Sequence, residues 1–345
     1  MSRYLLPALC LLLLSACAPP TQDAAQSSAA QSSNAGETAF PVLTGPYLGQ
    51  QPPGAEAKIF APGIVSTGLT ERDLVVSPDG NEIFWVAAAG NMDYAAIFST
   101  RLVDGAWTKP EALPFASDAT FPSIEPAISS DGNRFFFVSE RPRDGGTEAA
   151  DYDIWYVDRG ADGWGEPANL GPPVNTDDAE YFPSLTNDGT IYFTRDDSNL
   201  GEELVFRARP DGNGGYLDPE PLPEQVNTGN ARYNAHVARD ESFIIVPVAG
   251  RDDSLGATDY YVSFRNSDDS WSEAVHLGDQ VSSKSRLEYS PTLSPDGRYL
   301  FFMTSRPAHQ GTLSFDRLQE IQKEHGNGLS DIYWIDASFI SDLRP

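Results

Sequence analysis

Five positions that recur along the chain carry residues that could do chemistry if the fold brought them together. They are Glu71, Ser123, Glu180, Arg232 and Glu288, and Glu125 lies close to the second of them. Carboxylates and an arginine that converge on one channel mouth could bind a sugar, a cation or a peptide terminus. Two carboxyls in different environments could also act as acid and base in glycoside hydrolysis. The alternative is structural, since residues at equivalent positions of a repeat often bond backbone groups where strands begin.

The sequence contains no motif typical of another catalytic or metal-binding class. It has no G-x-S-x-G motif, no glycine-rich phosphate loop and no histidine pair at metal-binding spacing. Its four histidines are scattered at 236, 276, 309 and 325, and the acidic pairs at 151–153 and 177–178 are too sparse for a calcium loop. We therefore expect no cofactor and no metal.

A recurring turn phrase indicates the elements that must position these residues. It reads Ser-Pro-Asp-Gly at 77–80 and 294–297, Ser-Asp-Gly at 130–132, Asn-Asp-Gly at 187–189 and Arg-Asp-Glu at 239–241, about 55 residues apart. Asp-Gly between two β-rich segments is typical of a tight hairpin, because glycine tolerates the positive φ that the turn needs. The fourth phrase lacks the glycine, so its hairpin geometry is left open.

Each turn belongs to a repeat of four expected strands. A strand rich in β-formers follows it, at 83–86, 135–138, 191–193, 243–246 and 299–302. A third follows at 97–99, 154–157, 204–206, 260–262 and 332–335, and a fourth has an aromatic residue, then Pro or Ala, then Leu at steps of three. This pattern predicts an all-β, five-bladed β-propeller over 46–345. The repeats cover about 71–120, 121–180, 181–233, 234–289 and 290–336.

The fifth repeat lacks its fourth strand, and a matching segment stands at the start of the domain. Ile59, Pro62 and Val65 have the same spacing of three and three as Trp107, Pro110 and Leu113. We therefore expect a closing strand at about 57–66 to complete the last blade, since an open propeller would leave unpaired strand edges.

The repeat resembles the TolB-type, WD-like β-propeller repeat family over roughly residues 56–336. The resemblance is carried by the Ser-Pro-Asp-Gly turns, by the Arg-Pro segments at 139–142 and 304–307, and by third strands that begin at Asp153 and Asp331. That family includes scaffolds, binding modules and domains fused to enzymes. The resemblance therefore implies a fold and leaves the function open.

The N-terminus resembles a bacterial lipoprotein signal. Arg3 precedes an apolar segment at 5–14 that is too short to span a membrane, and Leu-Ser-Ala-Cys at 14–17 matches a lipobox. The resemblance implies a signal peptide over 1–16, cleavage before Cys17 and diacylation of its thiol. An ordinary signal peptide with an incidental cysteine is the alternative.

The segment after Cys17 is expected to be a tether. Residues 17–45 are rich in Ala, Ser, Gln and Pro without apolar periodicity, which is typical of disorder. Ala18, rather than Asp, follows the cysteine, and by resemblance to Gram-negative lipoproteins this favours the outer membrane over the inner one. We thus expect a lipid-anchored protein of the cell envelope.

The composition limits the classes of partner. A net charge of −27 disfavours nucleic acid and anionic lipid surfaces. The only cysteines are Cys10 and Cys17, so the mature domain has no disulfide and must be stable from its core alone. We expect membrane contact through the lipid anchor only, and a periplasmic protein or small ligand as the partner.

The expected topology sorts the loops by face. Tight turns join the first and second strands, whereas long loops join the second and third and share a face with the starts of the blades, where function usually lies. The longest loop, at 304–330, is predicted to hold a short helix with Ser314 as N-cap, ending near Gly326, which could cover the channel or be a decorative insertion.

Two further sets of residues have expected structural roles. Arginine–aspartate pairs are predicted to hold the long loops, and tryptophans are predicted to wedge between blades. The pairs are Arg141–Asp153, Arg251–Asp259 and Arg306–Asp331, and the wedges are Trp107, Trp164 and Trp271.

These observations favour a non-enzymatic envelope lipoprotein whose propeller binds or scaffolds a protein or small ligand. The alternative is a glycoside-acting enzyme that uses carboxylates at the channel mouth. Carboxylates tied to local backbone would favour the first, and two carboxyls suitably spaced in a pocket would favour the second.

Overall fold

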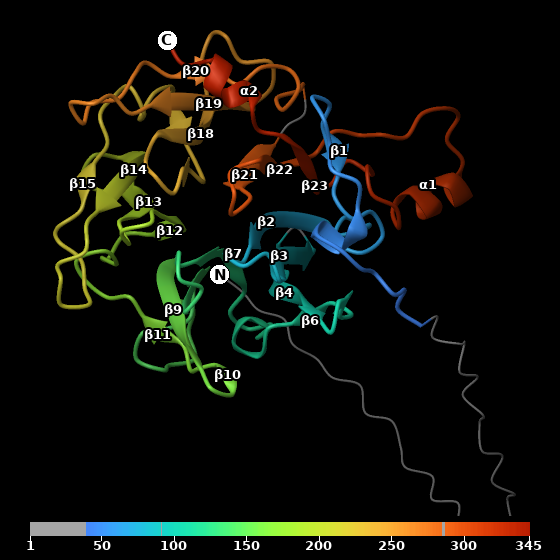
Figure 1. Ribbon diagram of the computed structural model, residues 1–345, viewed down its shortest axis with the longest axis horizontal. Helices are drawn as coiled ribbons and strands as arrows, with labels where there is room; N and C mark the ends of the chain where they lie inside the picture. The colour runs from blue at the N-terminus through green and yellow to red at the C-terminus, as the bar shows by residue number, and fades with distance from the viewer. Residues whose placement is uncertain (1–38, 91, 285–286) are drawn as a thin grey trace, which may run out of the picture. The chain divides into compact units, whose positions relative to one another are not determined.

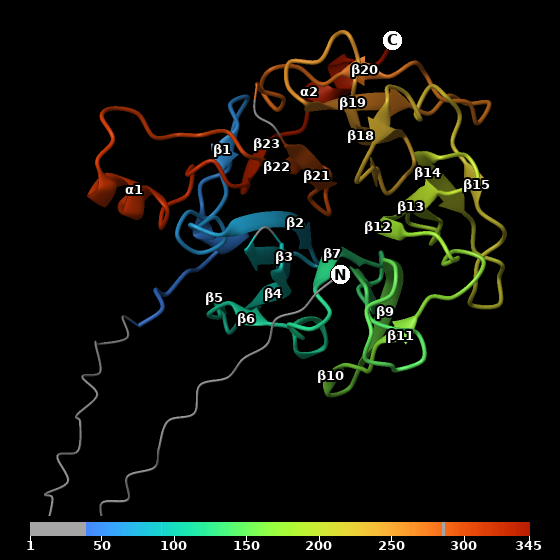
Figure 2. The same cartoon turned by 180° about the vertical axis from the view of Figure 1, so that it is seen from behind.

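Five antiparallel sheets follow one another around a common axis in the computed structural model, which describes residues 39–90, 92–284 and 287–345 (Figure 1). Residues 41–345 form one structural unit, and each sheet is one blade of a propeller. Figure 2 shows the same ring from behind. The prediction of an all-β, five-bladed propeller is confirmed.

The strands of each blade run in sequence order from the axis outward, apart from the strand that closes the ring. The first blade contains β2 (Thr70–Val76), β3 (Glu82–Ala89), β4 (Tyr94–Val103), β5 (Ala106–Trp107) and β6 (Glu111–Ala112). The second contains β7 (Ser123–Ile128), β8 (Arg134–Ser139), β9 (Asp153–Gly160), β10 (Gly163–Trp164) and β11 (Ala168–Asn169). The third contains β12 (Glu180–Leu185), β13 (Ile191–Asp197), β14 (Glu202–Ala208) and β15 (Glu220–Pro221).

The fourth blade contains β16 (Ala231–Arg232), β17 (His236–Val237), β18 (Phe243–Ala249), β19 (Thr258–Phe264) and β20 (Val275–His276). The fifth contains β21 (Glu288–Leu293), β22 (Tyr299–Thr304), β23 (Asp331–Asp336) and β1 (Lys58–Ile59). Helices are few, and among the described residues they are α1 (Phe315–Ile321), α2 (Phe339–Asp342) and 3-10 turns at Tyr47–Gly49 and Pro114–Ala116. No helix in the described part of the chain is both long and apolar enough to cross a membrane.

The recurring turn phrase forms the hairpin between the first two strands of every blade. In the first blade, Asp79 accepts hydrogen bonds from the Ser77 hydroxyl at 2.6 Å and from the Asn81 backbone N–H at 3.1 Å. Gly80 takes the positive φ of +73° that such a turn requires. In the fourth blade Glu241 adopts φ +56° at the same position, so the hairpin is kept without glycine.

The segment before the first blade closes the ring. β1 pairs with β23, with Lys58 opposite Trp334, and the Phe60 backbone N–H donates to the Ile332 carbonyl at 2.8 Å. The closing-strand prediction is confirmed, although the paired part is shorter than 57–66. Residues before 46 also belong to the fold, because the Leu43 carbonyl accepts from the Trp107 backbone N–H at 2.9 Å.

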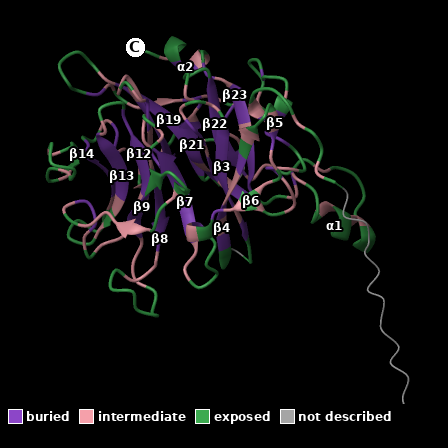
Figure 3. Ribbon diagram, turned by 60° about the horizontal axis from the view of Figure 1, so that its bottom comes forward, coloured by how far each residue is buried: buried purple, intermediate pink, exposed green. Residues whose placement is uncertain are grey.

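The core lies between neighbouring blades, and the strands are buried while the loops are exposed (Figure 3). Trp107 is 3% exposed in a cluster that joins the fifth and first blades, and Trp271 is 6% exposed in a cluster that joins the third and fourth. Trp164 is half-buried and its ring lies 5.5 Å from that of Phe135. The first two confirm the predicted wedges, and Trp164 fills this role only in part.

The predicted helix of the long loop is present, but not as a lid. Ser314 caps α1, accepting from the Arg317 backbone N–H at 3.1 Å, and the helix ends at Ile321, before Gly326. It has no buried residue and lies outside the ring, beyond β1, in both views (Figure 1, Figure 2). The idea that it covers the channel is wrong, because the loop between β22 and β23 carries the helix outward, away from the axis.

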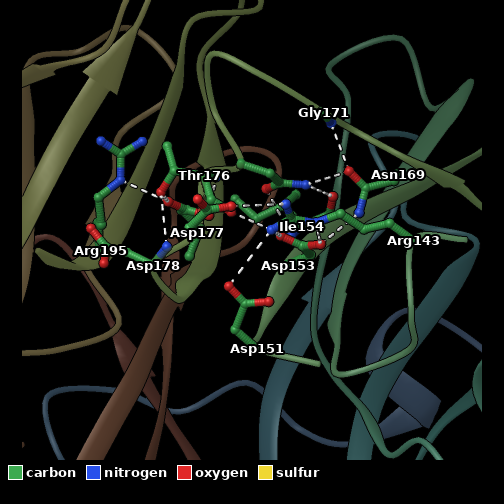
Figure 4. A network of polar contacts seen from close by, with 12 residues as sticks. Arg143, Asp151, Asp153, Ile154, Asn169, Gly171, Thr176, Asp177, Asp178 and Arg195 are labelled. Atoms are coloured by element: carbon green, nitrogen blue, oxygen red, sulfur yellow. Dashed lines mark hydrogen bonds and ion pairs between the residues drawn. The ribbon is translucent and has the colours of Figure 1, made fainter. Parts of the chain in front are cut away.

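The predicted arginine–aspartate pairs are also wrong. Asp153 is bound by Arg143, not Arg141, with Nε–Oδ2 and Nη2–Oδ1 distances of 2.5 and 2.8 Å (Figure 4). Asp259 instead accepts from the Gly256 backbone N–H and contacts His276, and Asp331 accepts from the Gly326 backbone N–H. Asp259 and Asp331 therefore cap loop backbone, whereas Asp153 pairs with a different arginine from the predicted one.

Candidate functional site

The three glutamates singled out in the sequence brace the loops that enter their blades. Each is the first or second residue of an inner strand and is fully buried. Each accepts a hydrogen bond from a hydroxyl a few residues upstream. The pairs are Thr67–Glu71, Thr176–Glu180 and Ser283–Glu288. These carboxylates hold local structure, which is the arrangement expected of a scaffold.

Glu180 shows the bracing in detail. Its Oε2 accepts from the Thr176 backbone N–H at 2.9 Å, and its Oε1 accepts from Arg195 Nε at 2.7 Å. Burial nevertheless outweighs these bonds and raises the pKa of Glu180 to about 6. Arg143 donates to the Thr176 carbonyl, so one polar network joins the second blade to the entrance of the third (Figure 4).

Arg232 has the same bracing role in the fourth blade. Its Nη2 donates to the Asn227 and Gly229 carbonyls at 2.9 and 3.1 Å. Its Nη1 pairs with Glu202 at 3.3 Å. Arg232 thus holds the loop that enters its blade and neutralises a carboxylate of the third blade.

Glu125 is the sequence-predicted residue that reaches the axis. It stands two positions after Ser123, and the corresponding residues of the other inner strands share its left-handed backbone. Their φ values are +56° at Asp73, +57° at Glu125, +50° at Phe182, +33° at Asn234 and +57° at Ser290. The pairing register shifts here in β2, β7, β12 and β21, as at a β-bulge. The bulge brings one residue from each blade to the centre.

These residues form an axial network that spans the blades. Glu125 accepts from Arg72 Nη2 at 2.9 Å, from Asn234 Nδ2 at 2.8 Å and from the Phe182 backbone N–H at 2.7 Å. Asp73 accepts from Arg72 Nε at 2.7 Å, from the Glu125 backbone N–H at 3.3 Å and from the Ser290 hydroxyl. All four carboxylate oxygens are therefore bonded by protein donors.

The electrostatics of the network follow from its burial. Removal from water raises the pKa of Glu125 to about 7, with Arg72 opposing and Asp73 adding to the shift. Burial disfavours the charge on Arg72, but Asp73 and Glu125 together hold the pKa of this guanidinium above its usual range. Sequence comparison of the repeats could have found the site, since this column is polar in four repeats.

A rim of partly exposed side chains precedes the network on the same inner strands. Arg72, Tyr181, Tyr233 and Tyr289 occupy the position before the bulged residue in four blades, and all are half-buried. The rings of Tyr233 and Tyr289 meet edge to face at 5.0 Å, and the Tyr181 hydroxyl donates to Glu203 at 2.8 Å. We call these three tyrosines with Arg72 and Glu203 the axial rim. Sequence reasoning missed it because it examined only the preceding position.

The described residues contain no cluster of His, Cys, Asp or Glu suited to a metal ion. The site therefore consists of a buried, internally satisfied polar network under an aromatic rim with one positive and one negative group. Such a surface can stack against a ligand and bond to it. It offers no unbonded axial carboxylate to a substrate.

Comparison with known proteins gives likenesses of fold alone. No protein-family model and no curated protein matches the chain. TolB from Acinetobacter baumannii is 17% identical with a TM-score of 0.46, over 78% of this chain and 57% of that one. An endo-arabinanase from Bacillus licheniformis is 11% identical with a TM-score of 0.45, over 77% and 93%. A puromycin-hydrolysing peptidase from Mycobacterium tuberculosis is 14% identical with a TM-score of 0.41, over 70% and 36%.

The chain thus spans little more than half of the TolB chain and about a third of the peptidase. The strand topology itself establishes the architecture, with five sheets, inner strands bulged at one level and the ring closed by β1. The chain is a five-bladed β-propeller.

Proposed function

We propose that the propeller is a non-enzymatic binding module of the cell envelope, and that the axial rim is its contact surface for a protein or small ligand. The observation that carries this proposal is that every oxygen of Asp73 and Glu125 already accepts a hydrogen bond from the protein. A general acid or base needs an oxygen within reach of the substrate's proton. The rim, in contrast, consists of side chains that are partly exposed.

The chemistry of the rim defines the class of ligand. Tyrosine presents a large amphipathic surface at small conformational cost, which is why it is enriched where proteins bind partners. Arg72 and Glu203 give the rim both signs of charge, so a ligand with both donor and acceptor groups fits it better than a simple cation does. The four buried residues that brace the blade entrances affect such a ligand through the loops that they hold. They are Glu71, Glu180, Arg232 and Glu288.

Site-specific photocrosslinking in the native envelope tests the proposal. A photoreactive side chain at position 233 should yield adducts with a discrete partner. The same group at position 315, on the exposed helix α1 outside the ring, is the matched control. Tyr289→Ala should reduce the adducts from position 233 by several-fold while the variant still unfolds in one cooperative transition. Equal adducts from both positions, or none from position 233, would contradict a binding role of the rim.

The second candidate is a glycoside-acting enzyme, which the juxtaposition of Asp73 and Glu125 at the axis supports. If it is correct, the wild type turns over an oligosaccharide and Glu125→Gln abolishes the turnover. We expect no turnover, because a substrate would first have to break bonds that join four blades. Activity that is lost in Glu125→Gln but kept in Glu224→Gln would replace the binding proposal with the enzymatic one.

A further inference from the structure

A cavity of about 280 Å³ lies on the hairpin side of the axial network, on the face where the sequence predicted only tight turns. Its wall takes residues from all five inner strands, among them Val75, Ile128, Leu185, His236 and Leu293. Phe182 belongs both to the network and to the cavity wall. The volume lies close to the lower end of the roughly 300–1,000 Å³ typical of small-molecule sites.

The one cation among the lining residues is Arg239, and its bonding is incomplete. Its Nη2 donates to the Ile128 carbonyl at 3.2 Å, whereas its buried Nη1 has no hydrogen-bond partner in the described part of the chain. Burial lowers the pKa of Arg239. A buried guanidinium with free donors is costly unless an acceptor reaches it.

The repeat itself does not require an arginine there. Four hairpins have an uncharged residue at the position before the turn aspartate, and only the fourth blade has Arg239. The four are Pro78, Ser130, Asn187 and Pro295. The fourth hairpin keeps its geometry through Glu241, so Arg239 is not needed for the turn.

Several other polar lining groups are bonded within the fold. His236 Nε2 accepts from the Leu293 backbone N–H at 3.2 Å, and His236 Nδ1 lies 3.3 Å from the Ser184 hydroxyl. Asp240 accepts from the Ser242 backbone N–H at 3.0 Å, and Asp296 from the Ser294 hydroxyl at 2.6 Å. The recognition chemistry of the cavity is therefore an apolar wall, one incompletely bonded guanidinium, and two carboxylates that are held within their own hairpins.

We propose that this cavity binds a carboxylate carried on a small apolar body, with Arg239 as the anchoring residue. A carboxylate would pair with the guanidinium of Arg239 where this residue lines the cavity, and the apolar wall would cover the body of the ligand. The ligand could be a free organic acid or the C-terminus of a peptide. This site lies on the face opposite the axial rim, so its test is independent of the proposed function.

Calorimetric titration at constant ionic strength provides the test, with benzoate as the probe and benzamide as its uncharged counterpart. We expect saturable binding of benzoate and much weaker binding of benzamide. Arg239→Gln should weaken benzoate binding by about tenfold or more, the scale of a lost hydrogen bond to a charged group. Arg298→Gln, an exposed arginine of the fifth-blade hairpin, is the matched control and should bind as the wild type does.

The same variants separate recognition from folding. Arg239→Gln should melt at or above the wild-type temperature, because it removes an incompletely bonded buried cation. Arg239→Lys keeps the charge without the planar fork and should bind benzoate with intermediate affinity. An acetylated tripeptide ending in phenylalanine, with a free or an amidated carboxyl, distinguishes the sources: tighter binding of its free acid than of benzoate indicates a chain terminus. Absence of benzoate and peptide binding, equal binding of benzamide, or unchanged binding by Arg239→Gln would overturn the proposal.

Discussion

At the scale of single residues, buried carboxyls control how stability depends on pH. Glu71 is fully buried and its Oε2 has no hydrogen-bond partner among the described residues. Burial, only partly opposed by hydrogen bonds from Thr67, raises the pKa of Glu71 from 4.5 to about 8. The folded state therefore binds a proton that the unfolded state has released, so this group's contribution to stability falls as the pH rises from about 4.5 to about 8.

Glu71→Gln should remove this loss. We expect the variant to be more stable than the wild type by roughly 1–3 kcal/mol near pH 8 and nearly equal to it near pH 4, because glutamine resembles the protonated acid. Urea denaturation at both pH values measures the effect. Glu224→Gln, at an exposed site, should show no such difference. If Glu71→Gln is less stable than the wild type at high pH, the Glu71 carboxylate is ionised in the folded state and stabilises it.

Glu241 shows how one residue replaces the glycine of a repeated turn. It holds a left-handed φ of +56°, which is unfavourable for a residue with a side chain. Its carboxylate accepts from the Tyr192 hydroxyl at 2.6 Å and pairs with Arg265 at 2.5 Å. These contacts offset the backbone strain and join the third and fourth blades.

Substitutions at Glu241 can separate the strain from the contacts. Glu241→Ala keeps the strained φ and loses both contacts, so it should lower the free energy of unfolding by about 1–3 kcal/mol. Glu241→Gly loses the same contacts but relieves the strain. Its loss of unfolding free energy should therefore be about 1 kcal/mol smaller than that of Glu241→Ala. Chemical denaturation of the two variants in parallel is the measurement. Equal losses would show that no strain is stored at this turn.

At the scale of elements, a strand of only two residues closes the ring. Only Lys58 and Ile59 of β1 pair with β23, yet the residue that follows is deeply packed. Phe60 is fully buried, with its ring 5.2 Å from those of both Phe301 and Trp334. Ring closure therefore depends on side-chain burial as much as on the strand ladder.

Phe60→Ala should destabilise the whole propeller. Loss of a buried aromatic side chain costs roughly 3–5 kcal/mol. Because β1 joins the first blade to the last, we expect one cooperative transition at lower denaturant rather than local fraying. Phe315→Ala removes the same side chain from α1, where it is 75% exposed, and should leave stability unchanged. A Phe60→Ala variant with wild-type stability would show that the closure contributes nothing.

At the scale of the whole molecule, the remaining expectation concerns the anchor. Cys17 and the rest of the signal lie outside the described residues, and we propose membrane attachment from the lipobox resemblance. Cys17→Ser should lose acyl labelling and move to the soluble periplasmic fraction, since stable anchoring requires more than one acyl chain. Fractionation with metabolic labelling is the measurement. A variant that remained with the membrane would disprove the anchor.

Local patterns in the sequence determined the blades of this protein, while the tertiary structure alone decided which residues meet at the axis. A turn such as Ser77–Gly80 is set by side-chain bonds between near neighbours and by the φ of one glycine, so it can be read directly. The closing segment was readable for a similar reason, because its spacing matches the other outer strands. Positions that are equivalent in the five repeats could likewise be aligned from the sequence.

The function of an aligned position could not be read in the same way. A bulge of one residue turns Glu125 to the axis and leaves Ser123 behind it. The partners of Glu125 lie 53, 57 and 109 residues away, at Arg72, Phe182 and Asn234. Which of them meet depends on the curvature of the ring, and therefore on the packing of five blades against one another.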